Sequence, residues 1–214
     1  MATVGIIDYG MGNLHSIANA LRYVATDEQI EISYDPDALA HMDRLVLPGV
    51  GAISYCMAEL HRLELDAMLM QTIGRKPLMG ICLGIEALMT HSEENEGIKA
   101  LGAFPGNALR FSPATAHADG IRRKIPHMGW NQVRQERGHP LWQDVAPDSW
   151  FYFVHSYYVV PDNRKHIIGT TEYGRRFASA MLRDNVFAVQ FHPEKSQSPG
   201  LQLLANFLQW DGRA

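Results

Sequence analysis

Cysteine is scarce in this sequence, and long apolar runs and a surplus of positive charge are missing. The 214 residues include two cysteines, too few for the disulfide framework of a small secreted protein. No apolar run approaches the roughly 18 residues that span a bilayer. Nineteen basic and 23 acidic residues give a formal net charge of -4, without the basic excess typical of nucleic-acid or membrane binding. These absences favour small-molecule or protein partners, with no nucleic acid and no membrane.

Signs of targeting and of disorder are also missing. Residues 1–8 do not show the basic and then apolar order of a signal peptide, so we expect a soluble protein in the reducing cytoplasm. The composition, 46% hydrophobic and 20% charged, is that of an ordinary globular protein. Because no repeat, low-complexity tract or linker-like stretch divides the chain, we expect a single domain over residues 1–214.

Strand and helix patterns alternate in the first part of the chain. Short apolar runs that end in turn residues predict buried strands at residues 4–7, 30–34, 44–47 and 78–81. Apolar residues at helical spacing predict helices at residues 14–24, 53–72 and 85–90. Asn13 is expected to cap the first of these helices. The alternation predicts an α/β fold with a mostly parallel central sheet flanked by helices.

The second half of the chain has a different pattern. Glycine and proline interrupt residues 104–133, where no helical period occurs. Aromatic and β-branched runs predict antiparallel strands at residues 150–160 and 167–173, and a hairpin of residues 178–183 and 186–191. A last helix is predicted at residues 200–210. We therefore expect an antiparallel β extension of the sheet.

One cysteine lies at the junction of a predicted strand and a predicted helix. Residues 80–84 read Gly-Ile-Cys-Leu-Gly, and about 0.014 matches to Gly-x-Cys-x-Gly are expected by chance from 18 glycines and 2 cysteines. A nucleophile on such a turn is raised above the sheet edge, and the following helix N-terminus stabilises a thiolate. Cys82 is therefore the candidate nucleophile, whereas Cys56 lies in an apolar helical stretch and is expected to pack in the core.

Two backbone N–H groups are candidates for an oxyanion site. The Leu83 N–H directly follows the nucleophile, and Val50 lies in a Pro-Gly-Val-Gly turn at residues 48–51, after the preceding strand. The glycines permit a local adjustment of the backbone that would aim the Val50 N–H at Cys82. Each donor of such a pair stabilises a tetrahedral intermediate by ~3 to 4 kcal/mol.

A nucleophilic cysteine needs a base, and two of the ten histidines begin a His-x-Glu sequence. His192 follows a predicted strand, where Glu194 can hold the imidazole tautomer. His91 lies nine residues after Cys82, which corresponds to about 13 Å along the predicted helix and is too far for proton transfer. The predicted catalytic residues are therefore Cys82, His192 and Glu194.

Blocks spread over almost the whole chain resemble the class-I, or triad, glutamine amidotransferases. The signatures around the nucleophile and the base match at residues 80–84 and 192–194. Further blocks are similar to those of the glutaminase subunits of imidazole glycerol phosphate synthases, at residues 8–14, 48–51, 126–131 and 153–157. The resemblance implies a flavodoxin-like amidotransferase fold without a cofactor.

The same resemblance implies the reaction. In that family the cysteine attacks the side-chain amide of L-glutamine, the histidine shuttles the proton, the glutamate orients the histidine, and a γ-glutamyl thioester is then hydrolysed. The ammonia passes to a partner (β/α)₈ cyclase subunit in a heterodimer. The cyclase forms imidazole glycerol phosphate and an aminoimidazole carboxamide ribotide, AICAR, which is a step of histidine biosynthesis.

Further site residues follow from the resemblance. It places the amino-acid part of glutamine near Gly49, Gly51, Glu94 and the backbone of Ser156 and Tyr157. It also implies four partner-facing residues, namely Asn13, Trp130, Tyr152 and Lys195. Trp130 and Tyr152 could equally be core aromatics on sequence grounds.

Glu86 departs from the family pattern, which has glutamine four residues after the nucleophile. At helical spacing Cys82 and Glu86 share a face, so Glu86 is expected to line the substrate site. One hypothesis is that an ionised carboxylate repels the substrate carboxylate and weakens glutamine use. The alternative is that Glu86 points toward the substrate ammonium.

Three other functions stay open on sequence grounds. The first is a partner-independent cysteine hydrolase, and the second is a binding module with a degenerate site, for which Glu86 is the only support. The third is a related amidotransferase that feeds ammonia to another acceptor. No cysteine or histidine pair has zinc-finger spacing and no His-Glu-x-x-His sequence occurs, so no metal site is predicted.

Overall fold

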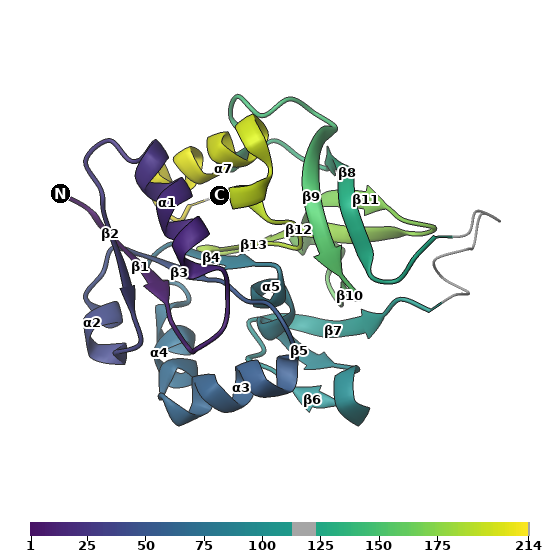
Figure 1. Ribbon diagram of the computed structural model, residues 1–214, viewed down its shortest axis with the longest axis horizontal. Helices are drawn as coiled ribbons and strands as arrows, with labels where there is room; N and C mark the ends of the chain where they lie inside the picture. The colour runs from purple at the N-terminus through teal and green to yellow at the C-terminus, as the bar shows by residue number, and fades with distance from the viewer. Residues whose placement is uncertain (113–122, 214) are drawn as a thin grey trace.

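The computed structural model describes residues 1–112 and 123–213 of the chain. Figure 1 shows a twisted central sheet that carries helices on both faces at one end and continues into a β-rich part at the other end. Within the described residues the strands form one connected sheet, with the order β2-β1-β3-β4-β13-β12-β10-β7-β5-β6 along its main path. The predicted α/β class with an antiparallel extension is confirmed.

The parallel half of the sheet consists of five strands. They are, in spatial order, β2 (Gln29–Ser33), β1 (Thr3–Ile7), β3 (Arg44–Leu47), β4 (Leu78–Ile81) and β13 (Val186–Val189). All neighbouring pairs among them are parallel. Each of the four strands predicted in the first part of the chain is present. The sheet therefore brings the carboxyl ends of β4 and β13 to one edge.

Both faces of this half are covered, which explains the continuous apolar runs. Helices α1 (Leu14–Val24) and α7 (Gln197–Gln209) lie on one face, and α2 (Pro36–Ala40), α3 (Ile53–Arg62) and α4 (Leu65–Thr72) lie on the other (Figure 1). Along β3, Val46 packs into the cluster under α1 and α7, while Leu45 and Leu47 pack into the cluster over α3 and α4. A strand that alternates between two apolar layers has no polar side.

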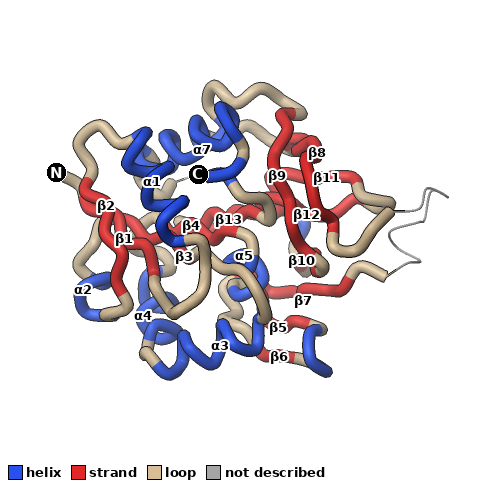
Figure 2. Tube along the Cα trace, in the orientation of Figure 1, coloured by secondary structure: helices blue, strands red, loops and turns tan. Residues whose placement is uncertain are grey.

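The antiparallel part begins at β13. The strands β12 (Arg176–Arg183), β10 (Tyr157–Pro161), β7 (Phe104–Arg110), β5 (Met89–Ser92) and β6 (Ile98–Lys99) continue the sheet, with one parallel pair, β5 with β7. The strands β11 (Ile167–Glu172), β8 (His127–Gln135) and β9 (Ser149–His155) branch from β12 (Figure 2). The short helices of this half are η1 (Glu94–Glu96), η2 (Pro140–Trp142), η3 (Arg164–His166) and η4 (Pro193–Lys195). The predicted hairpin is present as β12 and β13.

Three local predictions were wrong. The segment predicted as one helix at residues 53–72 is two helices, because Glu64 adopts a left-handed backbone with φ of 59° between α3 and α4. The helix predicted at residues 85–90 is α5 (Leu83–Ala87), and β5 follows it at once because Met89 pairs with β7. Asn13 occupies the N-cap position of α1, but its side chain makes no capping hydrogen bond.

No helix in the described part of the chain is both long and apolar enough to cross a membrane. The single domain over residues 1–214 stays a prediction.

Candidate active site

Cys82 lies on a sharp turn between β4 and α5. Its backbone has φ of 54° and ψ of -107°, a conformation that L-residues rarely adopt. Glycines flank the turn because there is no space beside it: a Cβ on Gly84 would lie 2.2 Å from the Leu47 carbonyl oxygen, and one on Gly80 would lie 2.8 Å from a Leu88 methyl group. The strained elbow predicted from residues 80–84 is therefore present.

His192 and Glu194 follow the end of β13, next to the elbow. His192 Nδ1 lies 2.8 Å from Glu194 Oε1, and both side chains are buried. The backbone holds this arrangement, because the His192 N–H donates to the Tyr152 carbonyl and the Ser196 hydroxyl donates to the His192 carbonyl at 2.6 Å. The carboxylate fixes the tautomer and leaves Nε2 for the sulfur side.

Electrostatics favour a proton on the imidazole. Burial alone would lower the pKa of His192, but its interactions with Cys82 and Glu194 outweigh burial and raise this pKa to about 10. The imidazole therefore interacts with the sulfur of Cys82 on one side and with the carboxylate of Glu194 on the other. The structure thus brings together the three residues predicted to be catalytic.

A cleft of about 440 Å³ opens over Cys82. The sulfur lies 3.8 Å from the Val154 carbonyl oxygen, and the Cys82 residue is 5% exposed. Predicted site residues on its walls are Val50, Gly51, Leu83, Glu86, Glu94, Ser156 and Tyr157. Val154, His155 and Pro126 also line it, and the sequence analysis did not single them out. Their only signal was that they lie in or beside the segments quoted for the family resemblance.

Glu94 has a structural task as well as a place on the wall. Its Oε2 accepts a hydrogen bond of 2.8 Å from the Ile53 N–H at the start of α3. This carboxylate therefore caps a helix N-terminus, where negative charge is favourable. The contact fixes the position of Glu94 at the cleft.

The two predicted oxyanion donors do not converge in this structure. The Leu83 N–H donates to the Gly49 carbonyl oxygen at 3.3 Å, so a carbonyl occupies the position where an oxyanion would bind. Gly49 is tightly enclosed, because a Cβ there would lie 2.4 Å from Tyr9 Oη and 2.7 Å from Leu83 Cβ. Turning over the peptide between Gly49 and Val50 would replace this carbonyl by the Val50 N–H. The backbone adjustment expected from the sequence is therefore still required.

Glu86 is buried, and its carboxyl differs from the ionised group assumed in the sequence analysis. Burial and, to a smaller extent, the charge of Glu94 raise the pKa of Glu86 to about 8, against the lowering effect of a hydrogen bond from Gln190. Gln190 Nε2 lies 3.2 Å from Glu86 Oε1. At neutral pH the protonated carboxyl can donate a hydrogen bond, as a glutamine side chain does. The raised pKa argues against an ionised, repulsive Glu86, and the repulsion hypothesis stays a prediction.

Three of the four predicted partner-facing residues gather on one surface. Trp130 on β8 and Tyr152 on β9 lie opposite each other, with ring centroids 6.1 Å apart, and Lys195 Nζ lies 5.9 Å from the Tyr152 ring. Trp130 is 43% exposed and Tyr152 is half-buried, so neither is a core aromatic. Met128 and Trp150, also exposed on these strands, extend the apolar surface and were missed by the sequence analysis. Asn13 lies at the N-cap position of α1.

Two further predictions have outcomes here. Cys56 is fully buried, as expected for a packing residue. His91 does not end a helix but is exposed on β5, so the distance argued along a helix axis was wrong. In the described residues no group of three His, Cys, Asp or Glu side chains could hold a metal ion. That the protein uses no metal stays a prediction.

Comparisons with known proteins agree over nearly the full length. A family model described as class-I glutamine amidotransferase matches residues 5–210. The chain is 52% identical over 212 residues to the imidazole glycerol phosphate synthase subunit HisH of Nitrosococcus oceani, covering 99% of each chain. It is 50% identical over 213 residues to subunit HisH 1 of the synthase from Pseudomonas aeruginosa, covering 100% of this chain and 99% of that one.

Solved structures share the fold at low sequence identity. PurLQS from Thermotoga maritima aligns with a TM-score of 0.73 at 17% identity, over 97% of this chain and 98% of that chain. A glutamine amidotransferase from the same organism aligns with a TM-score of 0.64 at 14% identity, over 97% and 96% of the two chains. This similarity concerns the fold alone.

Proposed function

This chain belongs to the class-I glutamine amidotransferase family, and we propose that it is the glutaminase subunit of an imidazole glycerol phosphate synthase. It hydrolyses L-glutamine and supplies ammonia for histidine biosynthesis. The observation that carries this proposal is the strained Cys82 at the cleft, which interacts with a His192 imidazole held by Glu194. The relatives of about 50% identity supply the synthase context.

The first half of the reaction forms a thioester. The Cys82 thiolate attacks the side-chain amide carbon of glutamine, and the carbonyl oxygen becomes an oxyanion. His192 gives its proton to the amide nitrogen, the carbon–nitrogen bond breaks, and ammonia leaves. Glu194 holds the imidazole in orientation and stabilises its charge throughout. Cys82 then carries a γ-glutamyl group.

The second half releases glutamate. A water molecule loses a proton to His192 and adds its oxygen to the thioester carbon. The carbon–sulfur bond breaks, glutamate leaves, and the thiolate with its imidazolium is restored. The amino-acid part of the substrate is held near Gly49, Gly51, Glu86, Glu94 and the backbone of Ser156 and Tyr157.

Stabilisation of the oxyanion depends on the loop at residues 48–51. The Leu83 N–H is engaged by the Gly49 carbonyl, so the isolated chain lacks a complete oxyanion site. We propose that the docked cyclase subunit favours the turned-over loop, in which the Val50 and Leu83 N–H groups both face the substrate. Trp130, Tyr152, Lys195 and Asn13 form the partner-facing set. The cyclase uses the ammonia to form imidazole glycerol phosphate and AICAR.

The test is glutamate release measured on the purified chain, alone and with a histidine-pathway cyclase and its ribotide substrate. We expect slow hydrolysis alone and at least a tenfold increase in the complex, with a Cys82→Ala variant inactive in both. Rapid hydrolysis that the cyclase does not change would indicate a partner-independent hydrolase. Absence of hydrolysis in the complex would refute the proposed function. A cytoplasmic location stays a prediction.

A further inference from the structure

Two buried histidines that the proposed chemistry does not use lie beside the cleft: His155 lines its wall, and His127 pairs with His155. His127 on β8 and His155 at the end of β9 lie directly opposite each other in the antiparallel pair. Both side chains point to the inner face of these strands, and His127 Nδ1 lies 2.8 Å from His155 Nε2. A buried polar pair at this distance needs defined protons on both rings.

The neighbouring atoms decide where those protons are. His155 Nδ1 lies 2.6 Å from the Tyr157 carbonyl oxygen, which can only accept, so Nδ1 carries the proton. His155 Nε2 is then an acceptor, and the His127 Nδ1–H donates to it. That leaves His127 Nε2 as an acceptor, and Asn131 Nδ2 lies 3.2 Å from it. The hydrogen bonds thus run in one direction: Asn131 donates to His127, His127 to His155, and His155 to the Tyr157 carbonyl oxygen.

Both rings are neutral. Burial and the neighbouring His155 lower the pKa of His127 to about 3; burial and His192 lower the pKa of His155 to about 4, against the opposite effect of its hydrogen bond to Tyr157. His127 is stacked between Phe153 and Tyr173, with ring centroids 4.8 Å and 3.9 Å away. The pair is therefore fixed by packing as well as by hydrogen bonds.

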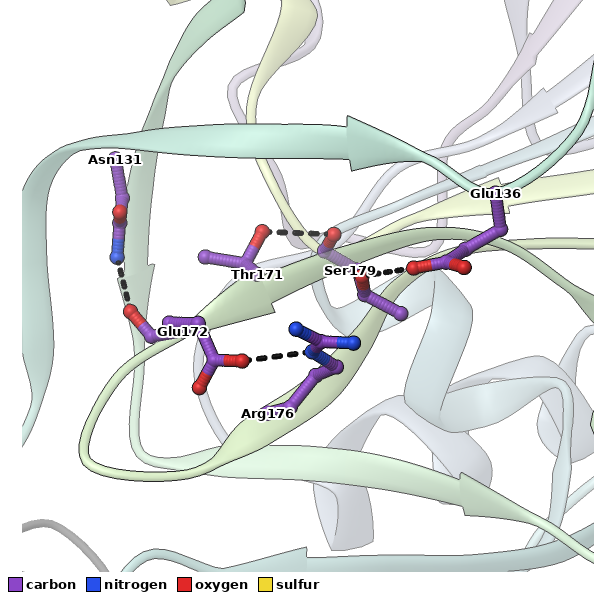
Figure 3. A network of polar contacts seen from close by, with 7 residues as sticks. Asn131, Glu136, Thr171, Glu172, Arg176 and Ser179 are labelled. Carbon is purple, nitrogen blue, oxygen red and sulfur yellow. Dashed lines mark hydrogen bonds and ion pairs between the residues drawn. The ribbon is translucent and has the colours of Figure 1, made fainter. Parts of the chain in front are cut away.

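The chain of hydrogen bonds is anchored at both ends. Asn131 Nδ2 also donates to the Glu172 carbonyl oxygen on β11 at 2.9 Å, a contact that Figure 3 shows. At the other end, Ser156 alone separates β9 from β10, so the backbone changes from one strand pairing to another within one residue. The His155 hydrogen bond to Tyr157 closes this kink. The kink forms part of the wall beside Cys82.

We propose that His127 and His155 are positioning residues that hold the Ser156–Tyr157 backbone in the conformation that binds the amino-acid part of glutamine. The inference rests on the proposed function, since it concerns the recognition of that substrate. His127 acts through His155 and touches neither the sulfur nor the leaving nitrogen in this role. Loss of the relay therefore weakens substrate recognition and leaves the reactivity of Cys82 unchanged.

Substitutions of His127 test this role because they remove or move the donor to His155. His127→Phe retains an aromatic ring for stacking and removes the donor to His155. In His127→Asn the amide nitrogen occupies about the place of Nδ1, whereas in His127→Gln it reaches about the place of Nε2. The Asn and Gln variants are a matched pair of neutral side chains, which keeps the test usable if the Phe variant does not fold. His166→Phe, at another histidine that contacts an aromatic ring, here edge-to-face, is the control.

Two reagents separate recognition from reactivity. 6-Diazo-5-oxonorleucine carries the amino-acid part of glutamine and alkylates the nucleophile, whereas iodoacetamide reacts with the same sulfur without it. For His127→Phe and His127→Gln we expect the capture rate with the diazo reagent to fall about tenfold, mainly through weaker saturation, as for loss of one buried hydrogen bond. His127→Asn and His166→Phe should stay within about threefold, and iodoacetamide rates within about twofold.

The outcomes discriminate. Wild-type capture rates in His127→Phe and His127→Gln, or equal losses with both reagents, would overturn the positioning role. Equal losses in His127→Asn and His127→Gln would also overturn it, because they would indicate a general packing effect. Failure of the diazo reagent to label Cys82 in the wild-type chain would refute the proposed function itself.

Discussion

The two halves of the catalytic centre are in different states. On the sulfur side, the strained Cys82 interacts with His192, which Glu194 holds, and all three side chains are buried. On the oxyanion side, the Gly49 carbonyl occupies the Leu83 N–H, and the second donor is turned away. The folded chain therefore already positions the nucleophile with its histidine and glutamate. The two N–H groups that would stabilise the oxyanion are not yet available. A glutaminase built this way releases little ammonia before its acceptor is present.

Removing the sulfur of Cys82 removes the nucleophile and is expected to have the largest effect on glutamine hydrolysis. Cys82→Ala should lower glutamine hydrolysis in the cyclase complex by about 10⁴-fold or more, because no covalent intermediate can form. The fold should persist, since alanine fits the small space at the elbow. Glutamate release and thermal unfolding measure the two effects. Residual activity within about 100-fold of the wild type would show that the sulfur is not the nucleophile.

Removing the Val50 N–H should impair stabilisation of the oxyanion without changing the reactivity of Cys82. Val50→Pro deletes the N–H that is proposed to turn toward the substrate, and we expect the cyclase-stimulated rate to fall about 10² to 10³-fold. Val50→Ala is the matched control, because it keeps the N–H and also shortens the exposed side chain. Iodoacetamide labelling of Cys82 should be similar in both variants. An equal loss in Val50→Ala would attribute the effect to the side chain.

The Glu86→Gln variant tests the protonation state of Glu86 through the pH dependence of the stability of the folded chain. A carboxyl whose folded pKa is raised to about 8 binds its proton in the folded chain from about pH 4.5 to 8, while the unfolded chain has lost it. The stability of the wild type therefore falls as pH rises through this window. Glu86→Gln should remove about 1 to 3 kcal/mol of that fall between pH 5.5 and 8. Denaturant unfolding at the two pH values measures it; parallel falls would contradict a buried, protonated Glu86.

The same variant tests glutamine use. At pH 7 its kcat/KM should be within about threefold of the wild type, because the protonated carboxyl and the amide both donate. Above pH 8 the wild type alone should lose activity relative to the variant. A large gain at pH 7 would instead support the repulsion hypothesis drawn from the sequence.

The smallest effect is expected at the partner surface. Trp130→Ala should weaken cyclase binding by about 1 to 2 kcal/mol and leave turnover at saturating cyclase within about threefold. Titration of glutaminase activity with cyclase measures both quantities. Trp150→Ala, on the neighbouring strand, distinguishes a local effect of Trp130 from a general loss of apolar surface.

The sequence predicted the parts of the fold that local patterns determine. Strands β3 and β4 were predicted at their observed bounds, because both are short apolar runs that end in turn residues. The break at Glu64 was missed because the apolar spacing continues from α3 into α4, and a single left-handed residue leaves no mark in that period. The early end of α5 depends on pairing of β5 with β7, a contact between distant residues.

In the site too, features set by local motifs could be predicted from the sequence, whereas features set by contacts between distant residues could not. Cys82, His192 and Glu194 were found because their motifs are local and chemically specific. The charge state of Glu86 could not be predicted, since it depends on burial against Gln190, which is 104 residues away. The pairing of His127 with His155 likewise depends on the register of β8 and β9. Nor could the sequence give the orientation of the Gly49 carbonyl, because the glycine permits either one.

The most direct test compares two rates on the same sulfur, with and without the cyclase and its ribotide substrate. The structure predicts that the cyclase raises glutamine turnover by at least tenfold while iodoacetamide labelling of Cys82 changes by less than about twofold. This result would mean that the partner completes the oxyanion site of an enzyme whose nucleophile is already prepared. A parallel rise of both rates would contradict it, because the partner would then be activating the sulfur itself.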